Sequence, residues 1–192
     1  MKRRYVLLVL VLATFLSSCI FDMNSSTPET LTAEDYKTIP VDNLFQLDVP
    51  EYMKEMPSLH PEGSLEYANI FKEAYTVVIH EDKEEFVTVF TELDEYDADK
   101  SIVENYMSVQ KKMFDENISN LRVEDYSLTE INGYPARQIK AYGRVEDLDA
   151  SYVIAFIEGE DNIYMIMNWT IEDRMQRFET TFEHINGTFK LM

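Results

Sequence analysis

Two almost wholly apolar segments, separated by a short acidic turn, constrain the fold of this chain most strongly. Residues 151–157 read SYVIAFI and residues 163–169 read IYMIMNW, with EGEDN between them. A strand that is apolar on both sides must be covered on both faces. We therefore expect these segments to be adjacent central strands of a sheet that carries further structure on each face.

Other segments alternate between apolar and polar residues, which indicates further strands. Residues 45–49 (FQLDV) end at Pro50, and residues 65–71 should form a hairpin with residues 75–80. The intervening residues 51–56 are expected to form a short helical turn. Residues 123–131 and 136–143 should pair across Asn132-Gly133, because both residues tolerate the positive φ of a tight turn.

Three segments have helical spacing instead. Phe86, Val89, Phe90 and Leu93 predict one helix. A second should run from Ser101 to about Asp115, because Ser101 and Glu104 have the spacing of a capping box.

The last helix is the clearest, with apolar residues stepping by three and four from Ile171 to Phe189. We expect Thr170 to cap its start and Asn186-Gly187 to lie at its end. The order of elements predicts an α+β fold: a central antiparallel sheet of about six to seven strands with helices on both faces, an α/β/α sandwich.

The N-terminus has the composition of a secretory leader. Lys2, Arg3 and Arg4 precede an uncharged apolar run, residues 5–16, and two serines follow. A helix of this length reaches only about 18 Å, against roughly 30 Å for the hydrocarbon core of a bilayer. Residues 1–18 are therefore predicted to be a cleaved signal peptide rather than a membrane span.

The only cysteine of the chain, Cys19, follows this leader directly. A lone cysteine is ordinarily a small buried core residue. Here the sequence Leu16-Ser17-Ser18-Cys19 resembles the lipobox of bacterial lipoproteins, which implies that Cys19 becomes the mature N-terminus and carries acyl chains. Two or three chains hold a protein firmly to a membrane, so the resemblance implies a lipid-anchored protein of the bacterial cell envelope. In a Gram-negative host, Ile20 after the cysteine favours the outer membrane.

Composition and charge bound the remaining chain. Residues 19–34 are expected to be the lipidated N-terminus and a flexible tether, and residues 35–192 a single globular domain. The formal net charge is −19, and because residues 1–18 contribute +3, residues 19–192 carry −22. This charge repels phosphate backbones, so we expect no nucleic-acid partner. It also repels anionic lipid headgroups, so the domain should hang off the bilayer.

Three pieces of the chain resemble the PsbP-like superfamily, including the DcrB-like bacterial lipoproteins. They are NLFQLDVPEYMK (residues 43–54), TEINGYPARQIKA (129–141), and NIYMIMNWT (162–170) with the following amphipathic helix. The resemblance spans about residues 40–190 and implies a central antiparallel sheet between helices, in a family whose members mostly bind or assemble with other proteins. Its matching motifs are structural, so it implies no functional residue and no particular function.

The sequence offers few candidates for chemistry. His60, His80 and His184 lie in different predicted elements without metal-ligand spacing. Asp97-x-Asp99-x-Ser101 begins like a calcium loop, but Ile102 replaces the glycine at its sixth position and Ser108 the glutamate at its twelfth. An acidic connector that ends in a helix cap explains this stretch better.

Aromatic side chains could line a cleft if they are exposed, but packing is their ordinary role. The candidates are Tyr67, Tyr134, Tyr142 and Trp169.

We therefore expect a non-enzymatic, protein-binding or assembly module with no cofactor, held to the membrane through Cys19, with an unidentified envelope protein as its partner. One alternative is a carrier of a small apolar ligand between sheet and helix. A second alternative is an unrecognised envelope hydrolase.

Overall fold

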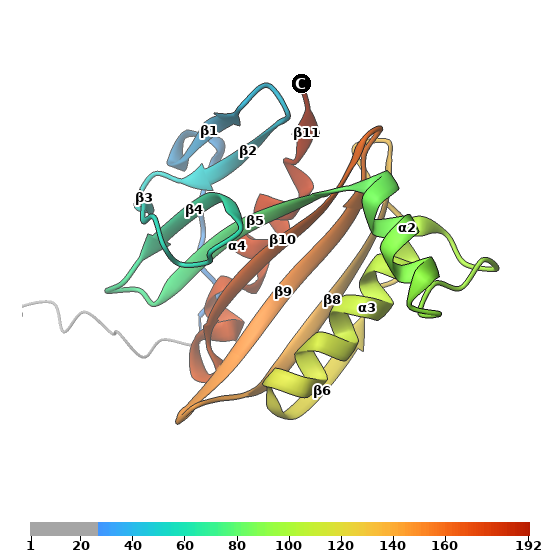
Figure 1. Ribbon diagram of the computed structural model, residues 1–192. Helices are drawn as coiled ribbons and strands as arrows, with labels where there is room; N and C mark the ends of the chain where they lie inside the picture. Colours follow the sequence, from blue (N-terminus) through green and yellow to red (C-terminus); the bar gives the residue numbers. More distant parts are fainter. Residues whose placement is uncertain (1–26) are drawn as a thin grey trace, which may run out of the picture.

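The computed structural model describes residues 27–192, and the predicted signal peptide and Cys19 lie outside the described residues. Within that range a large antiparallel sheet has the strand order β3-β4-β5-β10-β9-β8-β6, and β7 pairs with β8 beside this row. Figure 1 shows its long, twisted central strands. The strands are β3 (Lys54–Glu55), β4 (Gly63–Asn69), β5 (Ala74–Asp82), β6 (Ser119–Asp125), β7 (Glu130–Ile131), β8 (Tyr134–Val145), β9 (Leu148–Glu158) and β10 (Asn162–Ile171).

A second, three-stranded sheet combines segments from both ends of the described chain. Its order is β1-β2-β11, with β1 at Tyr36–Val41, β2 at Phe45–Pro50 and β11 at Lys190–Leu191. The predicted strand at residues 45–49 is confirmed as β2, but it belongs to this small sheet. Its inward residues Phe45, Leu47 and Val49 are fully buried, because the small sheet packs its apolar face against the rest of the core.

Helices cover both faces of the large sheet, which confirms the α+β fold. Helices α2 (Lys83–Glu92) and α3 (Ile102–Asn117) pack on one face, and α4 (Met175–Gly187) packs with the small sheet on the other (Figure 1). Two apolar cores result, one on each side of the sheet. The central strands β9 and β10 contribute to both cores, as their apolar sequences predict.

A chain of hydrogen bonds between one buried hydroxyl and three buried amide side chains joins the sheet to α4. Thr76 Oγ1 donates to Asn168 Oδ1 at 2.9 Å, and Asn168 Nδ2 donates to Asn186 Oδ1 at 2.8 Å. Asn186 Nδ2 then donates to Gln138 Oε1 at 2.9 Å. Because buried amides must find partners, these bonds fix the position of α4 on strands β5, β8 and β10.

Several local predictions are confirmed. The capping box at Ser101 and Glu104 is present at the start of α3. Asn132 and Gly133 form the turn between β7 and β8 with φ values of 49° and 88°. Residues 63–69 and 74–82 form the expected hairpin. Residues 83–92 form a helix where the apolar spacing predicted one.

Three local predictions are wrong. Residues 51–56 contain strand β3 rather than a helical turn, because Lys54 and Glu55 pair with the edge of β4. Residues 123–131 form two strands, β6 and β7, instead of one.

The start of the last helix is also shifted. Thr170 is the penultimate residue of β10 and caps nothing; a 3-10 turn at Glu172–Arg174 comes before α4. The end of the helix agrees with the prediction, because Gly187 is its last residue and Thr188 is the C-cap.

The predicted tether, residues 19–34, is described only from residue 27. Glu29 within it contacts the domain, because its backbone N–H donates to Arg177 O at 2.8 Å and its carboxylate accepts from Tyr52 and Lys72. Thr32 then forms a capping box with Asp35. Within residues 27–192, no helix is long and apolar enough to cross a membrane.

Candidate functional site

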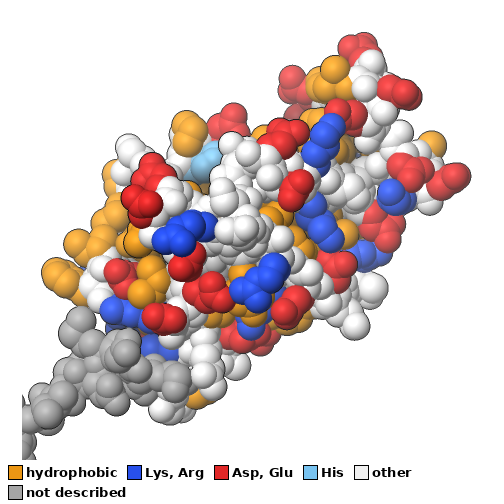
Figure 2. Space-filling model, turned by 90° about the horizontal axis from the view of Figure 1, so that it is seen from below, with side chains coloured by type: hydrophobic (Ala, Val, Ile, Leu, Met, Phe, Trp, Pro, Cys, Tyr) orange, Lys and Arg blue, Asp and Glu red, His pale blue; other side chains and the backbone are white. Residues whose placement is uncertain are grey.

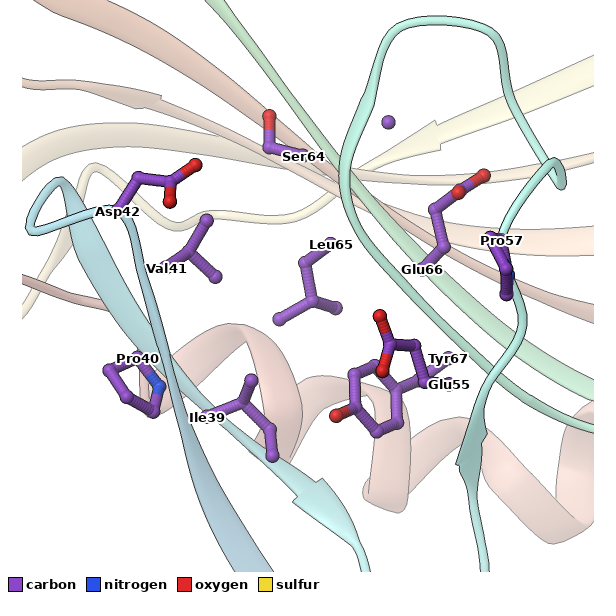
Figure 3. A pocket seen from close by; sticks show the side chains of 11 residues that line it. Ile39, Pro40, Val41, Asp42, Glu55, Pro57, Ser64, Leu65, Glu66 and Tyr67 are labelled. Atoms are coloured by element: carbon purple, nitrogen blue, oxygen red, sulfur yellow. The ribbon is translucent and has the colours of Figure 1, made fainter.

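An open groove lies between the small sheet and the edge of the large sheet. It has a volume of about 380 Å³, and residues from β1, β3 and β4 line it. In Figure 3, Leu65 lies at its centre, with Ile39 and Val41 on one side and Tyr67 on the other. We refer to it as the β1–β4 groove, and its lining residues are Ile39, Pro40, Val41, Asp42, Glu55, Pro57, Gly63, Ser64, Leu65, Glu66 and Tyr67.

The chain shapes this groove through the packing of two separate sheets. β1 is an edge strand of the small sheet, and β4 pairs with the two-residue β3 only at Ala68 and Tyr67. The remaining edge of β4 faces the loop at residues 56–62. Buried Leu65 and nearly buried Val41 supply an apolar base, whereas Pro40 and Asp42 are exposed at the rim.

Glu66 holds the loop on its side of the groove. Its carboxylate accepts from Ser58 N at 2.9 Å and from His60 N at 2.6 Å. These backbone N–H groups, that of His60 foremost, lower the pKa of Glu66. The Glu66 side chain also passes close to Gly63. A Cβ at position 63 would lie only 2.7 Å from Glu66 Cγ, so a larger residue there would displace the Glu66 side chain.

The groove is acidic. Asp42, Glu55 and Glu66 are among its lining residues, and these residues include no lysine or arginine. In Figure 3, Asp42 and Glu66 lie on opposite sides of the opening. Burial, and secondarily the Glu55 carboxylate, raise the pKa of the Tyr67 phenol, so it stays protonated and remains a hydrogen-bond donor. The arrangement suits a cationic ligand with an apolar side chain that reaches Leu65.

The structure places the three histidines in separate elements. His60 accepts from Glu62 N within the loop before β4, and His184 lies in the last turn of α4, 4.3 Å from the Tyr36 ring. His80 on β5 lies next to the groove, with Nδ1 2.6 Å from Ser64 Oγ.

The contact between Ser64 and His80 joins a hydroxyl to a base, as in hydrolases. A hydrolytic site also requires a group that orients the base and donors for an oxyanion. The other described contact of His80 is its ring stacking with Tyr164 at 6.2 Å. The pair lies where the β4–β5 register shifts between Gly63 and Leu65, so it links the two strands at an irregularity.

The candidate aromatic residues are not gathered in one place. Tyr67 lines the β1–β4 groove, and Tyr134 lines a second depression of about 340 Å³ beside β11. Tyr142 lies under the cations of Arg122 and Lys140, at 5.0 and 5.3 Å. Trp169 stacks on Tyr75 with ring centroids 5.0 Å apart. Of these four residues, Tyr67 alone lines the β1–β4 groove.

The acidic stretch before α3 is occupied by contacts within the chain. Asp97 pairs with Lys100 at 3.0 Å and accepts from Asp99 N, also at 3.0 Å. Asn105 accepts from Asp97 N. Among residues 27–192, no group of three His, Cys, Asp or Glu side chains is placed to hold a metal ion.

A third depression, also of about 340 Å³, lies between α3 and the chain around Tyr126–Thr129, with Met107 and Leu128 in its lining. Like the β1–β4 groove it is open to the surface. The sequence predicted none of these depressions, because each depends on how separate elements pack against one another.

The fold is similar to that of known structures, although no protein-family model and no curated protein sequence matches the chain. The solution structure of cyanobacterial PsbP (CyanoP) from Synechocystis matches with a TM-score of 0.53 at 9% identity, over 86% of this chain and 98% of that one. This likeness confirms the PsbP-like fold and, at such low identity, shows the fold alone.

Two further crystal structures have lower scores. PA94 of Pseudomonas aeruginosa, a protein of unknown function and putative regulator, has a TM-score of 0.48 at 13% identity, over 80% of this chain and 94% of its own. LpqN of Mycobacterium tuberculosis, involved in cell envelope biogenesis, has a TM-score of 0.49 at 9% identity, over 85% and 97%.

Proposed function

We propose that this chain is a non-enzymatic, lipid-anchored protein of the bacterial cell envelope whose domain binds another envelope protein through the β1–β4 groove. The observation that carries the binding role is the placement of the Asp42 and Glu55 carboxylates in the lining of a groove with an apolar base at Leu65. The partner segment would be cationic, with one apolar side chain directed to Leu65.

The anchor at Cys19 gives this binding role a mechanism. Acyl chains confine the domain to a membrane surface, which raises its effective concentration near membrane-bound partners. A weak groove contact is then sufficient, because the partner does not have to be captured from bulk solution.

The groove can be tested by crosslinking in cells. A photoreactive amino acid at exposed Pro40, which lines the groove, should crosslink to one partner protein when the full chain is expressed. The same probe at exposed Glu116 on α3 should not give that product.

Charge removal then tests whether the acids of the groove bind this partner. The double substitution Asp42→Asn with Glu55→Gln should lower the crosslink yield at Pro40 roughly 2- to 30-fold, because each exposed ion pair contributes about 0.2–1 kcal/mol. The control, Glu146→Gln with Asp147→Asn, removes the same charge from the exposed turn between β8 and β9. If both pairs lowered the yield equally, or neither did, recognition by the groove would be refuted.

A further inference from the structure

The turn between β4 and β5 presents two apolar side chains to solvent. Ile70 is 52% exposed and Phe71 is 82% exposed, the largest exposed fraction among the large apolar residues described. Single exposed apolar residues are ordinary on protein surfaces. Two adjacent ones at the tip of a hairpin form a small protruding patch, which we call the Phe71 tip.

The Phe71 tip is held rigidly. Asn69 Oδ1 accepts from the backbone N–H groups of Phe71 and Lys72, at 3.1 and 3.0 Å. From the other side, Arg174 Nη1 donates to Lys72 O at 2.8 Å and to Phe71 O at 3.3 Å. The outward position of Phe71 is therefore fixed by side chains on two elements.

The described chain begins beside this tip. Glu29 forms an ion pair with Lys72 at 2.6 Å, and its carboxylate also accepts from Tyr52 Oη at 2.7 Å and from Thr181 Oγ1 at 3.2 Å. The Glu29 side chain is only 7% exposed. These contacts hold Glu29 against Lys72, the residue that follows Phe71 in the hairpin.

The length of the preceding chain limits how far this end can lie from an anchor. Seven residues lie between Cys19 and Thr27, and the eight Cα–Cα steps from one to the other span at most roughly 28 Å. If Cys19 carries acyl chains, the part of the domain beside Glu29 is the part that the anchor holds closest to the bilayer.

Two ion pairs lie around the tip, although the chain is strongly acidic. Glu29 pairs with Lys72, and Glu73 pairs with Arg174 at 3.1 Å. Arg177 lies nearby, with its guanidinium 5.5 Å from the ring of Phe178. Figure 2 shows several apolar side chains toward one end of the molecule, among side chains of both charges. These ion pairs neutralise Glu29 and Glu73, which reduces the repulsion that the two carboxylates would exert on anionic headgroups.

We propose that the Phe71 tip rests in the headgroup region of the membrane that holds the lipid anchor. This inference rests on the anchored state in the proposed function and adds an orientation to it. An aromatic side chain beside basic ones suits the membrane–water interface, where both the apolar body and the charged groups are accommodated. The rest of the acidic domain then points away from the bilayer.

Depth-dependent fluorescence quenching tests the orientation. The mature protein is purified from membranes and reconstituted into phosphatidylethanolamine–phosphatidylglycerol vesicles whose acyl chains carry bromine, a short-range quencher. Phe71→Trp is compared with Leu93→Trp, an equally apolar site that is 60% exposed at the end of α2. Native Trp169 gives the same background in both proteins. We expect quenching and a blue shift for Phe71→Trp and neither for Leu93→Trp.

The outcomes distinguish the membrane contact of the Phe71 tip from the lipid anchor on which it depends. If the protein does not float with vesicles and carries no acyl mass on Cys19, the anchor itself is refuted. If it floats but Phe71→Trp is quenched no more than Leu93→Trp, the anchor stands and the contact of the tip is refuted. A photocrosslinker at Phe71 that labels a protein in cells, together with absent quenching, would instead assign the tip to a protein partner and overturn the proposal.

Discussion

Asn168 shows how one polar residue organises the apolar centre of this domain. It is fully buried on β10, accepts from Thr76 and donates both to Asn186 and, at 3.2 Å, to Val153 O. A buried amide without partners is costly, so its position is defined far more narrowly than that of an apolar neighbour.

Asn168→Ala should lower the free energy of unfolding by about 3 kcal/mol. The substitution leaves the hydroxyl of Thr76 and the amide of Asn186 without this partner in the core, and each unpaired buried group costs about 1–3 kcal/mol. Urea unfolding followed by circular dichroism measures the change. Asn117→Ala, at the exposed end of α3, is the matched control and should change stability by less than about 0.5 kcal/mol. Equal effects of the two substitutions would contradict a structural role for the network.

The sequence predicts that Asn168 lies in a buried strand, but it does not predict which residues bond to it. The run IYMIMNW predicts a buried strand, and Asn168 within it is the one residue that conflicts with that environment. A polar side chain in a buried strand indicates a hydrogen bond within the core. Its partner Asn186, and Gln138 to which Asn186 donates in turn, could not be named, because only the position of α4 and the register of β8 bring them together.

Among the elements, α3 combines a predicted local feature with an unpredicted tertiary one. The capping box of Ser101 and Glu104 follows from sequence spacing alone. In the fold Glu104 also forms an ion pair with Arg137 on β8 at 2.8 Å. The Arg137 guanidinium, followed by the Ser101 backbone and hydroxyl, lowers the pKa of Glu104 from 4.5 to about 2.

This lowered pKa makes part of the stability dependent on pH. Folding favours the ionised carboxylate, so the contribution is complete above about pH 4.5 and is lost as the pH falls toward 2. Glu104→Gln should therefore lose less stability than the native chain between pH 5 and pH 2.5, as measured by urea midpoints. Glu116→Gln, at the exposed C-terminal end of α3, keeps the contacts of Glu104 and should behave like the native chain. An unchanged pH dependence in Glu104→Gln would show that the pair does not contribute.

Long elements were predicted more successfully than short ones. β9, β10, α3 and α4 extend over many residues, so their hydrophobic period is clear even where a boundary shifts. The two-residue strands β3, β7 and β11 have no period to detect, and they exist because a neighbouring edge offers hydrogen bonds. The β1–β4 groove depends on one such strand, β3, and on the packing of the small sheet against β4, which no local pattern in the sequence predicts.

For the molecule as a whole, the decisive prediction concerns Cys19. Wild-type protein should fractionate with membranes and have an N-terminal mass that includes acyl chains, whereas Cys19→Ala should not be processed to an acylated form. Membrane fractionation with mass spectrometry of the intact chain makes the comparison. A wild-type protein that begins at Met1, or one with a free thiol and no added mass, would refute the envelope assignment.

The pairing of β5 with β10 has a consequence for how the domain is made. β5 lies in the first half of the described chain and its partner near the end, so the large sheet cannot close until most of the polypeptide exists. Because contacts distant in sequence form slowly, newly synthesised chains stay open for longer than a string of local hairpins would. An open chain can still be threaded through a narrow translocation channel, so this late closure is compatible with the export that the predicted signal peptide would require.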